Sequence, residues 1–120
     1  MEHVKAMGIK LVVHLLWAWI LFSLIFDFTV TNALVTAVVV AVLIYVVGDL
    51  VVLRKWGNVP ATLLDAGSAF LVAWMYLATT SDEETLVPSL LFALGVAVFE
   101  WFFHEWLLKS NVIPDERSTR

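Results

Sequence analysis

Four long apolar segments restrict what this chain can fold into. They cover about residues 4–26, 30–53, 59–78 and 86–108. Each holds roughly 20 residues or more, which is enough for a helix with a rise of about 1.5 Å per residue to cross a hydrocarbon layer of ~30 Å. Lipid offers the backbone no hydrogen-bond partners, so helices are expected in spite of the many valines and isoleucines. The sequence therefore predicts an all-α, integral membrane bundle of four transmembrane helices.

Composition supports a single membrane domain. Hydrophobic residues make up 62% of the 120 residues and charged residues 15%, whereas soluble domains average about 45–50% and about 25%. We expect one transmembrane domain over residues 1–108, followed by a polar cytoplasmic tail over residues 109–120. The chain has no cysteine, which excludes disulfides and thiolate metal sites.

The basic residues indicate the orientation of the bundle. All seven fall at one end of the predicted helices: Lys5, Lys10, Arg54, Lys55, Lys109, Arg117 and Arg120. The two connections at the opposite end carry only acids, namely Asp27 and the run 82–84. Because lysine and arginine are retained on the cytoplasmic side of a membrane, we predict that both termini and the middle loop are cytoplasmic.

Two of the connections carry capping signals. Thr29 or Thr31 is placed to cap the second helix, and Asn58 is placed to cap the third, with Pro60 in its first turn. Side chains of this kind accept hydrogen bonds from the free N–H groups at a helix start. The sequence therefore predicts short, well-defined turns between the helices.

The charged and histidine residues inside the four segments all lie in the half nearest the basic end. Residues three or four apart share one face of a helix, and each segment has one such polar stripe. The predicted polar cluster contains Lys10, His14, Asp49, Asp65, Glu100 and His104, with Tyr45, Gly48, Asn58 and Thr62 as supporting residues. We expect these side chains to meet at one level of the bundle.

The depth of each charged side chain in the bilayer decides whether water can stabilise its charge or a partner within the protein is needed. Asp49 and His104 lie only about 6 Å inside their predicted helix ends, where snorkelling and interfacial water are expected to be available to them. Glu100 and His14 lie about 12–15 Å inside, where an unmatched charge costs about 2.5–3.5 kcal/mol. The deeper pair must therefore be neutral or be matched within the protein.

The predicted polar cluster has more negative than positive charges. With neutral histidines it sets one ammonium group against three carboxylates, a net charge of −2. Three structural features would neutralise this excess charge: a protonated histidine, a protonated carboxylate or an inward-folded Arg54. A bound exogenous cation would be a functional one.

Three functional hypotheses follow. The first is a non-enzymatic structural or accessory protein in which the cluster fixes the helix register. The second is a proton or cation pathway, formed by a homo-oligomer because the bundle is small for a monomeric transporter. The third is a metal-binding membrane protein or enzyme. Glu100 and His104 on one helix face are its candidate ligands, and Asp49, Asp65 or His14 would add more.

Motifs for other functions are missing from the sequence. It contains no Gly-rich phosphate loop, nucleophile elbow or paired catalytic motif. We therefore expect no enzymatic activity, no catalytic residues, no cofactor and no nucleic-acid partner. The expected partner is the lipid bilayer.

A group of mainly non-hydrophobic positions carries a family resemblance. It comprises Gly48-Asp49-Leu50, Gly57-Asn58, Ala61-Thr62, Asp65, Ala69-Phe70, the N-terminal His3-Val4-Lys5-Ala6, and Glu100 with His104. In these positions the chain resembles the YndM-like family of small four-helix membrane proteins from Bacillus-type bacteria. The resemblance implies a multi-pass protein of a bacterial plasma membrane, and it implies no substrate and no catalytic residues.

Overall fold

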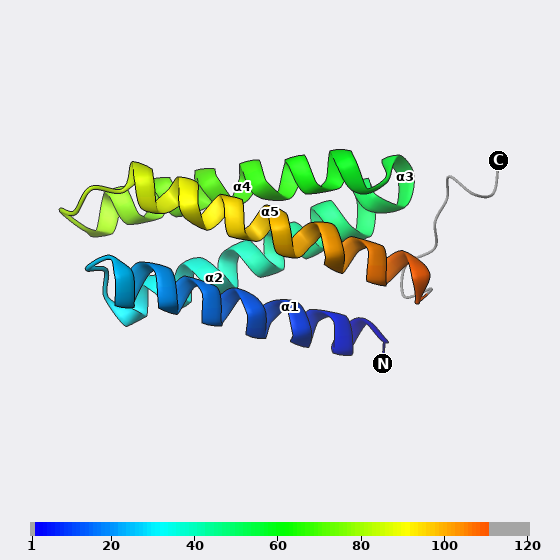
Figure 1. Cartoon of the computed structure of the whole chain (residues 1–120), viewed down its shortest axis with the longest axis horizontal. Coiled ribbons are helices and arrows are strands. Elements are labelled where there is room, and N and C mark those ends of the chain that lie inside the picture. Colours follow the sequence, from blue (N-terminus) through cyan, green and yellow to red (C-terminus); the bar gives the residue numbers. More distant parts are fainter. Residues whose placement is uncertain (1, 111–120) are drawn as a thin grey trace.

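The computed structural model describes residues 2–110, which form four helical rods (Figure 1). The first rod is α1 (Glu2–Ala18) continued by the π-helical stretch η1 (Trp19–Ile25). The second is α2 (Val30–Ile44), continued by the π-helical stretch η2 (Tyr45–Leu53) and by α3 (Arg54–Trp56). The third and fourth are α4 (Asn58–Thr80) and α5 (Leu86–Lys109). All four are long and apolar enough to cross a membrane, which confirms the predicted all-α transmembrane bundle.

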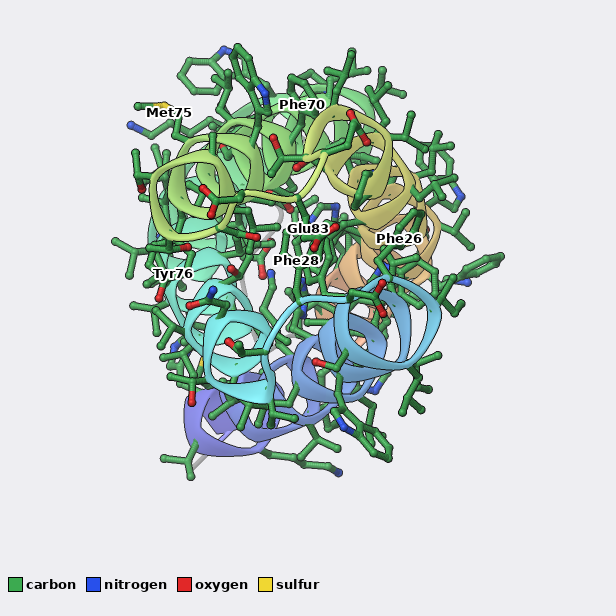
Figure 2. The ribbon with its side chains drawn as sticks, turned by 90° about the vertical axis from the view of Figure 1, so that its left-hand side faces the viewer. Phe26, Phe28, Phe70, Met75, Tyr76 and Glu83 are labelled. Carbon is green, nitrogen blue, oxygen red and sulfur yellow. The ribbon has the colours of Figure 1, made fainter. Side chains whose placement is uncertain are left out.

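The rods run up and down, so that the chain reverses at both ends of the bundle. In Figure 1 the N-terminus, α3 and the end of α5 lie at the right, and the connections around residues 26–29 and 81–85 lie at the left. Seen end-on in Figure 2, the order around the bundle is α1, α2, α4 and α5. The basic residues within the described part therefore gather at one end and the acidic connections at the other. Most of the predicted tail, residues 111–120, lies outside the described residues.

The turns show one cap as expected and one that differs. Thr29 caps α2, because its hydroxyl accepts a hydrogen bond of 3.1 Å from the Asn32 backbone N–H. The prediction that Asn58 caps α4 is wrong. Gly57 takes that position with φ of 92°, a conformation that glycine adopts without steric cost. Asn58 is instead the first helical residue, and its side chain is buried.

Two apolar layers fill the interior above and below the level of the polar cluster. The far layer surrounds Phe22 and Phe92, whose ring centroids are 5.0 Å apart. Small residues such as Ala37 and Ala73 also lie in this layer and allow close helix packing. The near layer, beside α3, contains Ala6, Tyr45, Leu53, Ala61, Phe103 and Leu107. The surface is apolar too, and side chains such as Met75 point outward, as expected for helices in lipid (Figure 2).

Gly95 marks a close contact between α1 and α5. A Cβ atom at this position would lie 2.4 Å from the Trp17 indole, whose Nε1 donates a 3.1 Å hydrogen bond to the Phe92 carbonyl. We therefore predict that Gly95→Ala lowers the free energy of unfolding by about 1–3 kcal/mol through overpacking. Chemical or thermal unfolding in detergent, followed by circular dichroism, measures this.

Gly67→Ala is the matched control. Nothing lies within 4 Å of a Cβ atom at position 67, so this variant should be as stable as the wild type or slightly more stable. Equal stability of the two variants would contradict the packing at Gly95.

Candidate functional site

Six ionisable side chains from all four rods meet in one group, which we call the polar cluster. Its members are Lys10 and His14 on α1, Asp49 on η2, Asp65 on α4, and Glu100 and His104 on α5. Five of the six residues are 0% exposed and His14 is 1% exposed. The structure thus brings together every ionisable residue that the sequence placed at this level, while their role stays a prediction.

Lys10 occupies the side of the polar cluster formed by α1. Its Nζ donates hydrogen bonds to Asp49 Oδ2 at 2.5 Å and to Glu100 Oε2 at 3.0 Å. The same ammonium group lies 5.0 Å from the centroid of the Phe103 ring and 5.7 Å from that of Tyr45, within cation–π range. One cation therefore joins α1 to both η2 and α5.

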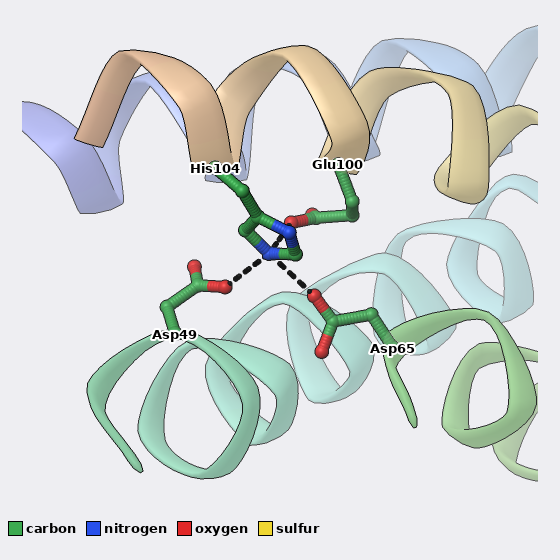
Figure 3. A group of neighbouring side chains, drawn as sticks. All are labelled: Asp49, Asp65, Glu100 and His104. Carbon is green, nitrogen blue, oxygen red and sulfur yellow. Dashed lines mark hydrogen bonds and ion pairs between the residues drawn. The ribbon is translucent and has the colours of Figure 1, made fainter. Parts of the chain in front are cut away.

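The imidazole of His104 is the point where three carboxylates converge (Figure 3). Its Nε2 lies 2.7 Å from Asp49 Oδ1, 2.9 Å from Asp65 Oδ2 and 3.1 Å from Glu100 Oε2. The three carboxylates come from three different rods. Asp49 belongs to η2, and π-helical turns of this kind occur frequently at functional sites.

The other ring nitrogen of His104 faces Asn58. The Asn58 Nδ2 donates to the Trp101 carbonyl at 3.0 Å and to Glu105 Oε1 at 3.1 Å, so its Oδ1 is the atom turned toward His104 Nδ1, at 2.8 Å. The Thr62 hydroxyl also donates to that Oδ1, at 2.8 Å. Two acceptors therefore surround Nδ1, Asn58 Oδ1 and the hydroxyl oxygen of Thr62 at 3.2 Å, and Nδ1 must carry a hydrogen.

Gly48 and Tyr45, the other two supporting residues, act in different ways. A Cβ atom at Gly48 would lie 1.9 Å from Asp65 Oδ1, so the space for that carboxylate exists because position 48 has no side chain. The Tyr45 ring faces Lys10, while its hydroxyl bonds to His3 Nδ1 at 2.7 Å.

Sequence reasoning missed His3 and Glu105. His3 lies in the first turn of its helix, with no polar stripe to mark it. Glu105 lies off the helix face shared by Glu100 and His104, yet it is partly buried against Asn58. A contact partner on another helix is the only signal that distinguishes them.

Several buried polar atoms of the polar cluster have no hydrogen bond. They are both oxygens of Asp65, Oε1 of Glu100 and Nε2 of His14. His14 Nε2 lies 3.5 Å from Glu100 Oε1, while its Nδ1 bonds to the Lys10 carbonyl at 2.7 Å. Such atoms are uncommon in folded proteins, because each costs about 1–3 kcal/mol when buried alone.

Apolar residues close the polar cluster on both sides along each rod. The flanking pairs are Ala6 and Ala18 on α1, Ile44 and Leu53 on the second rod, Ala61 and Ala69 on α4, and Val96 and Leu107 on α5. The expectation that interfacial water serves Asp49 and His104 is therefore wrong, since both are 0% exposed. The near apolar layer covers them, although they lie close to the helix ends in sequence.

Removing the Lys10 charge tests how strongly the polar cluster is coupled to folding. Lys10→Met keeps an unbranched side chain but leaves carboxylates buried without their ammonium partner, so we predict a loss of about 3–5 kcal/mol in the free energy of unfolding. Lys5→Met is the control, because Lys5 is exposed and its ammonium group lies 5.9 Å from the centroid of the Trp106 ring. It should change stability by less than about 1 kcal/mol. Denaturant unfolding in detergent measures both, and similar values for the two variants would refute the coupling.

Comparison with known proteins gives a family match over the whole chain. The family described as "Protein of unknown function (DUF2512)" matches residues 1–120. The chain is also 29% identical over 117 residues to the "Uncharacterized membrane protein YndM" of Bacillus subtilis (strain 168). That alignment covers 96% of this chain but 65% of the relative, so the chain spans slightly less than two thirds of the relative's length. No solved structure matches significantly. These similarities confirm the resemblance to the YndM-like family.

Proposed function

Because this chain belongs to the family of proteins of unknown function designated DUF2512, we propose a role from the geometry of its interior. The role is that of a non-enzymatic structural or accessory protein of the membrane. The observation that carries it is a buried polar cluster that joins all four rods and is closed by apolar layers on both sides. Such a cluster holds the helices in one arrangement.

The polar cluster specifies helix register through short contacts. Lys10 connects α1 to two other rods, and His104 connects α5 to η2 and α4, all at 2.5–3.0 Å. Moving one helix by a single residue shifts its side chains by about 1.5 Å along the axis, which would break these contacts. An unmatched charge in hydrocarbon is costly, so one register is strongly favoured over its neighbours.

The composition of the far half of the bundle favours a closed, structural role and argues against a permeation pathway. No Asp, Glu, Lys, Arg or His occurs in residues 15–26, 30–48, 66–81 or 85–99. The described side chains at that level form the apolar layer around Phe22 and Phe92. A proton or ion crossing one copy of this bundle would meet no acidic, basic or histidine side chain in these stretches of the helices.

In this proposal the protein spans a bacterial plasma membrane in a defined orientation. Four helices able to span a membrane support a multi-pass membrane protein. We place it in a bacterial plasma membrane, with the end that carries Lys5, Arg54, Lys55 and Lys109 toward the cytoplasm. The lipid bilayer surrounds the exposed apolar side chains, and a homo-oligomer stays a prediction.

The absence of cysteine allows a direct test of orientation. Asp82→Cys and Lys109→Cys each introduce one thiol, the first in the connection between α4 and α5 and the second at the end of α5. These two elements lie at opposite ends of the bundle (Figure 1). On intact cells a membrane-impermeant maleimide should label the thiol at position 82, and it should label position 109 only after the membrane is permeabilised. The reverse pattern would invert the proposed topology.

Flux measurements in proteoliposomes separate the structural role from a pathway. We expect the wild type to pass protons and potassium no faster than protein-free liposomes, as followed with a pH-sensitive dye under an imposed gradient. Glu100→Gln should then change the thermal stability and leave flux at the background level. Glu84→Gln, in an exposed connection, is the control. Wild-type flux above background that Glu100→Gln alone abolishes would overturn the structural proposal in favour of a pathway.

A further inference from the structure

We infer that the polar cluster is a binding site for a divalent first-row transition metal ion. The proposed ligands are His104 through Nε2 and one carboxylate oxygen each from Asp49, Asp65 and Glu100. This inference goes beyond the structural role proposed above, because protons alone could hold such a cluster together.

The four ligand atoms already converge. One from each residue lies within 4.8 Å of the others, and all four residues are buried. The carboxylate oxygens lie 2.7–3.1 Å from His104 Nε2, and Figure 3 shows the side chains pointing toward one another. Atoms that ligate one metal ion at about 2.1 Å are themselves roughly 3.0–3.4 Å apart. The distances from Nε2 are therefore close to this range, whereas carboxylate oxygens up to 4.8 Å apart would have to approach one another by up to about 1–2 Å to complete a coordination shell.

The hydrogen-bonding of His104 directs a lone pair toward this point. Asn58 fixes a hydrogen on Nδ1, because its Oδ1 is the atom that lies 2.8 Å away. Nε2 of the neutral imidazole is then an acceptor, and it faces three other acceptors. Metal-binding histidines show this arrangement, with the second nitrogen donating to an oxygen of the protein.

A buried carboxylate oxygen without a partner gives further support. Asp65 is 0% exposed, yet its Oδ1 has no hydrogen bond, and the contact of its Oδ2 is with His104 Nε2 at 2.9 Å. A proton on His104 Nε2 could make one straight hydrogen bond and would leave other carboxylate oxygens unmatched. A metal ion attracts all three carboxylates at once.

The net charge of the polar cluster also favours a bound divalent cation. With neutral imidazoles the polar cluster has a net charge of −2, from three carboxylates and the Lys10 ammonium. A single divalent cation brings this sum to zero, which would otherwise take two protons, because one proton on Nε2 leaves −1. In an interior without solvent the neutral sum is strongly preferred.

The ligand types select the class of metal. One imidazole nitrogen with three carboxylate oxygens and no sulfur suits Zn²⁺, Fe²⁺ or Mn²⁺. Mg²⁺ prefers oxygen ligands only and retains several waters, for which this fully buried site offers little room. Gly48 contributes by leaving space for the Asp65 carboxylate.

Metal analysis of the full chain purified in detergent tests the site. Cells are grown with added Zn²⁺ or Mn²⁺, and bound metal is measured by mass spectrometry after dialysis. The wild type should carry about one ion per chain, and Asp65→Asn, which keeps the side-chain shape, should carry at least about tenfold less. Asp82→Asn, at the opposite end of the bundle, should bind like the wild type. Wild-type metal no higher than that of Asp65→Asn would overturn the site.

A measurement on the wild type alone covers the case in which Asp65→Asn does not fold. Metal-stripped protein should unfold at a higher temperature after addition of Zn²⁺ or Mn²⁺, and not after addition of Mg²⁺. An unchanged unfolding temperature with all three ions would overturn the site. The flux experiment is independent of both results, so failure of the metal site and failure of the structural role can be told apart.

Discussion

The ammonium group of Lys10 lies in a part of the bundle that is closed to solvent, and two other rods provide carboxylates that neutralise its charge. Asp49 and Glu100 bind it directly at 2.5 and 3.0 Å. A carboxylate in this interior also needs a partner, and His104 lies against Asp49. The same nitrogen of His104 contacts Asp65 on α4. The matching of buried charge, which lipid cannot provide, therefore sets which faces of the four rods meet.

Apolar packing protects this arrangement. The near layer, with Leu53, Phe103 and Leu107, excludes solvent from residues that lie only a turn or two from the helix ends. The far layer packs small and aromatic residues at the other end of the bundle. Attraction between the buried charges is strongest where water is excluded, so the apolar layers and the polar cluster stabilise one another.

Neutralisation of the polar cluster links structure to function. A cluster neutralised by protons would be a purely structural device. A cluster neutralised by a divalent ion would make the fold of this membrane protein depend on metal supply, since a site assembled from three rods is present only when those rods are packed. Both alternatives use the same residues, and the hydrogen held on His104 Nδ1 by Asn58 distinguishes this histidine from an ordinary buried one.

The sequence by itself determined the four spanning helices and the polar stripe on each, because hydrophobic length and helical periodicity are local properties. It could not decide the contacts between rods. Asn58 reads as a cap in sequence, but the left-handed turn at Gly57 moves it inside the bundle to orient His104. Asp49 is interfacial by its position in the sequence, yet it is 0% exposed beneath the near apolar layer. Partner choice and burial depend on residues far apart in the chain, so only the tertiary structure decided them.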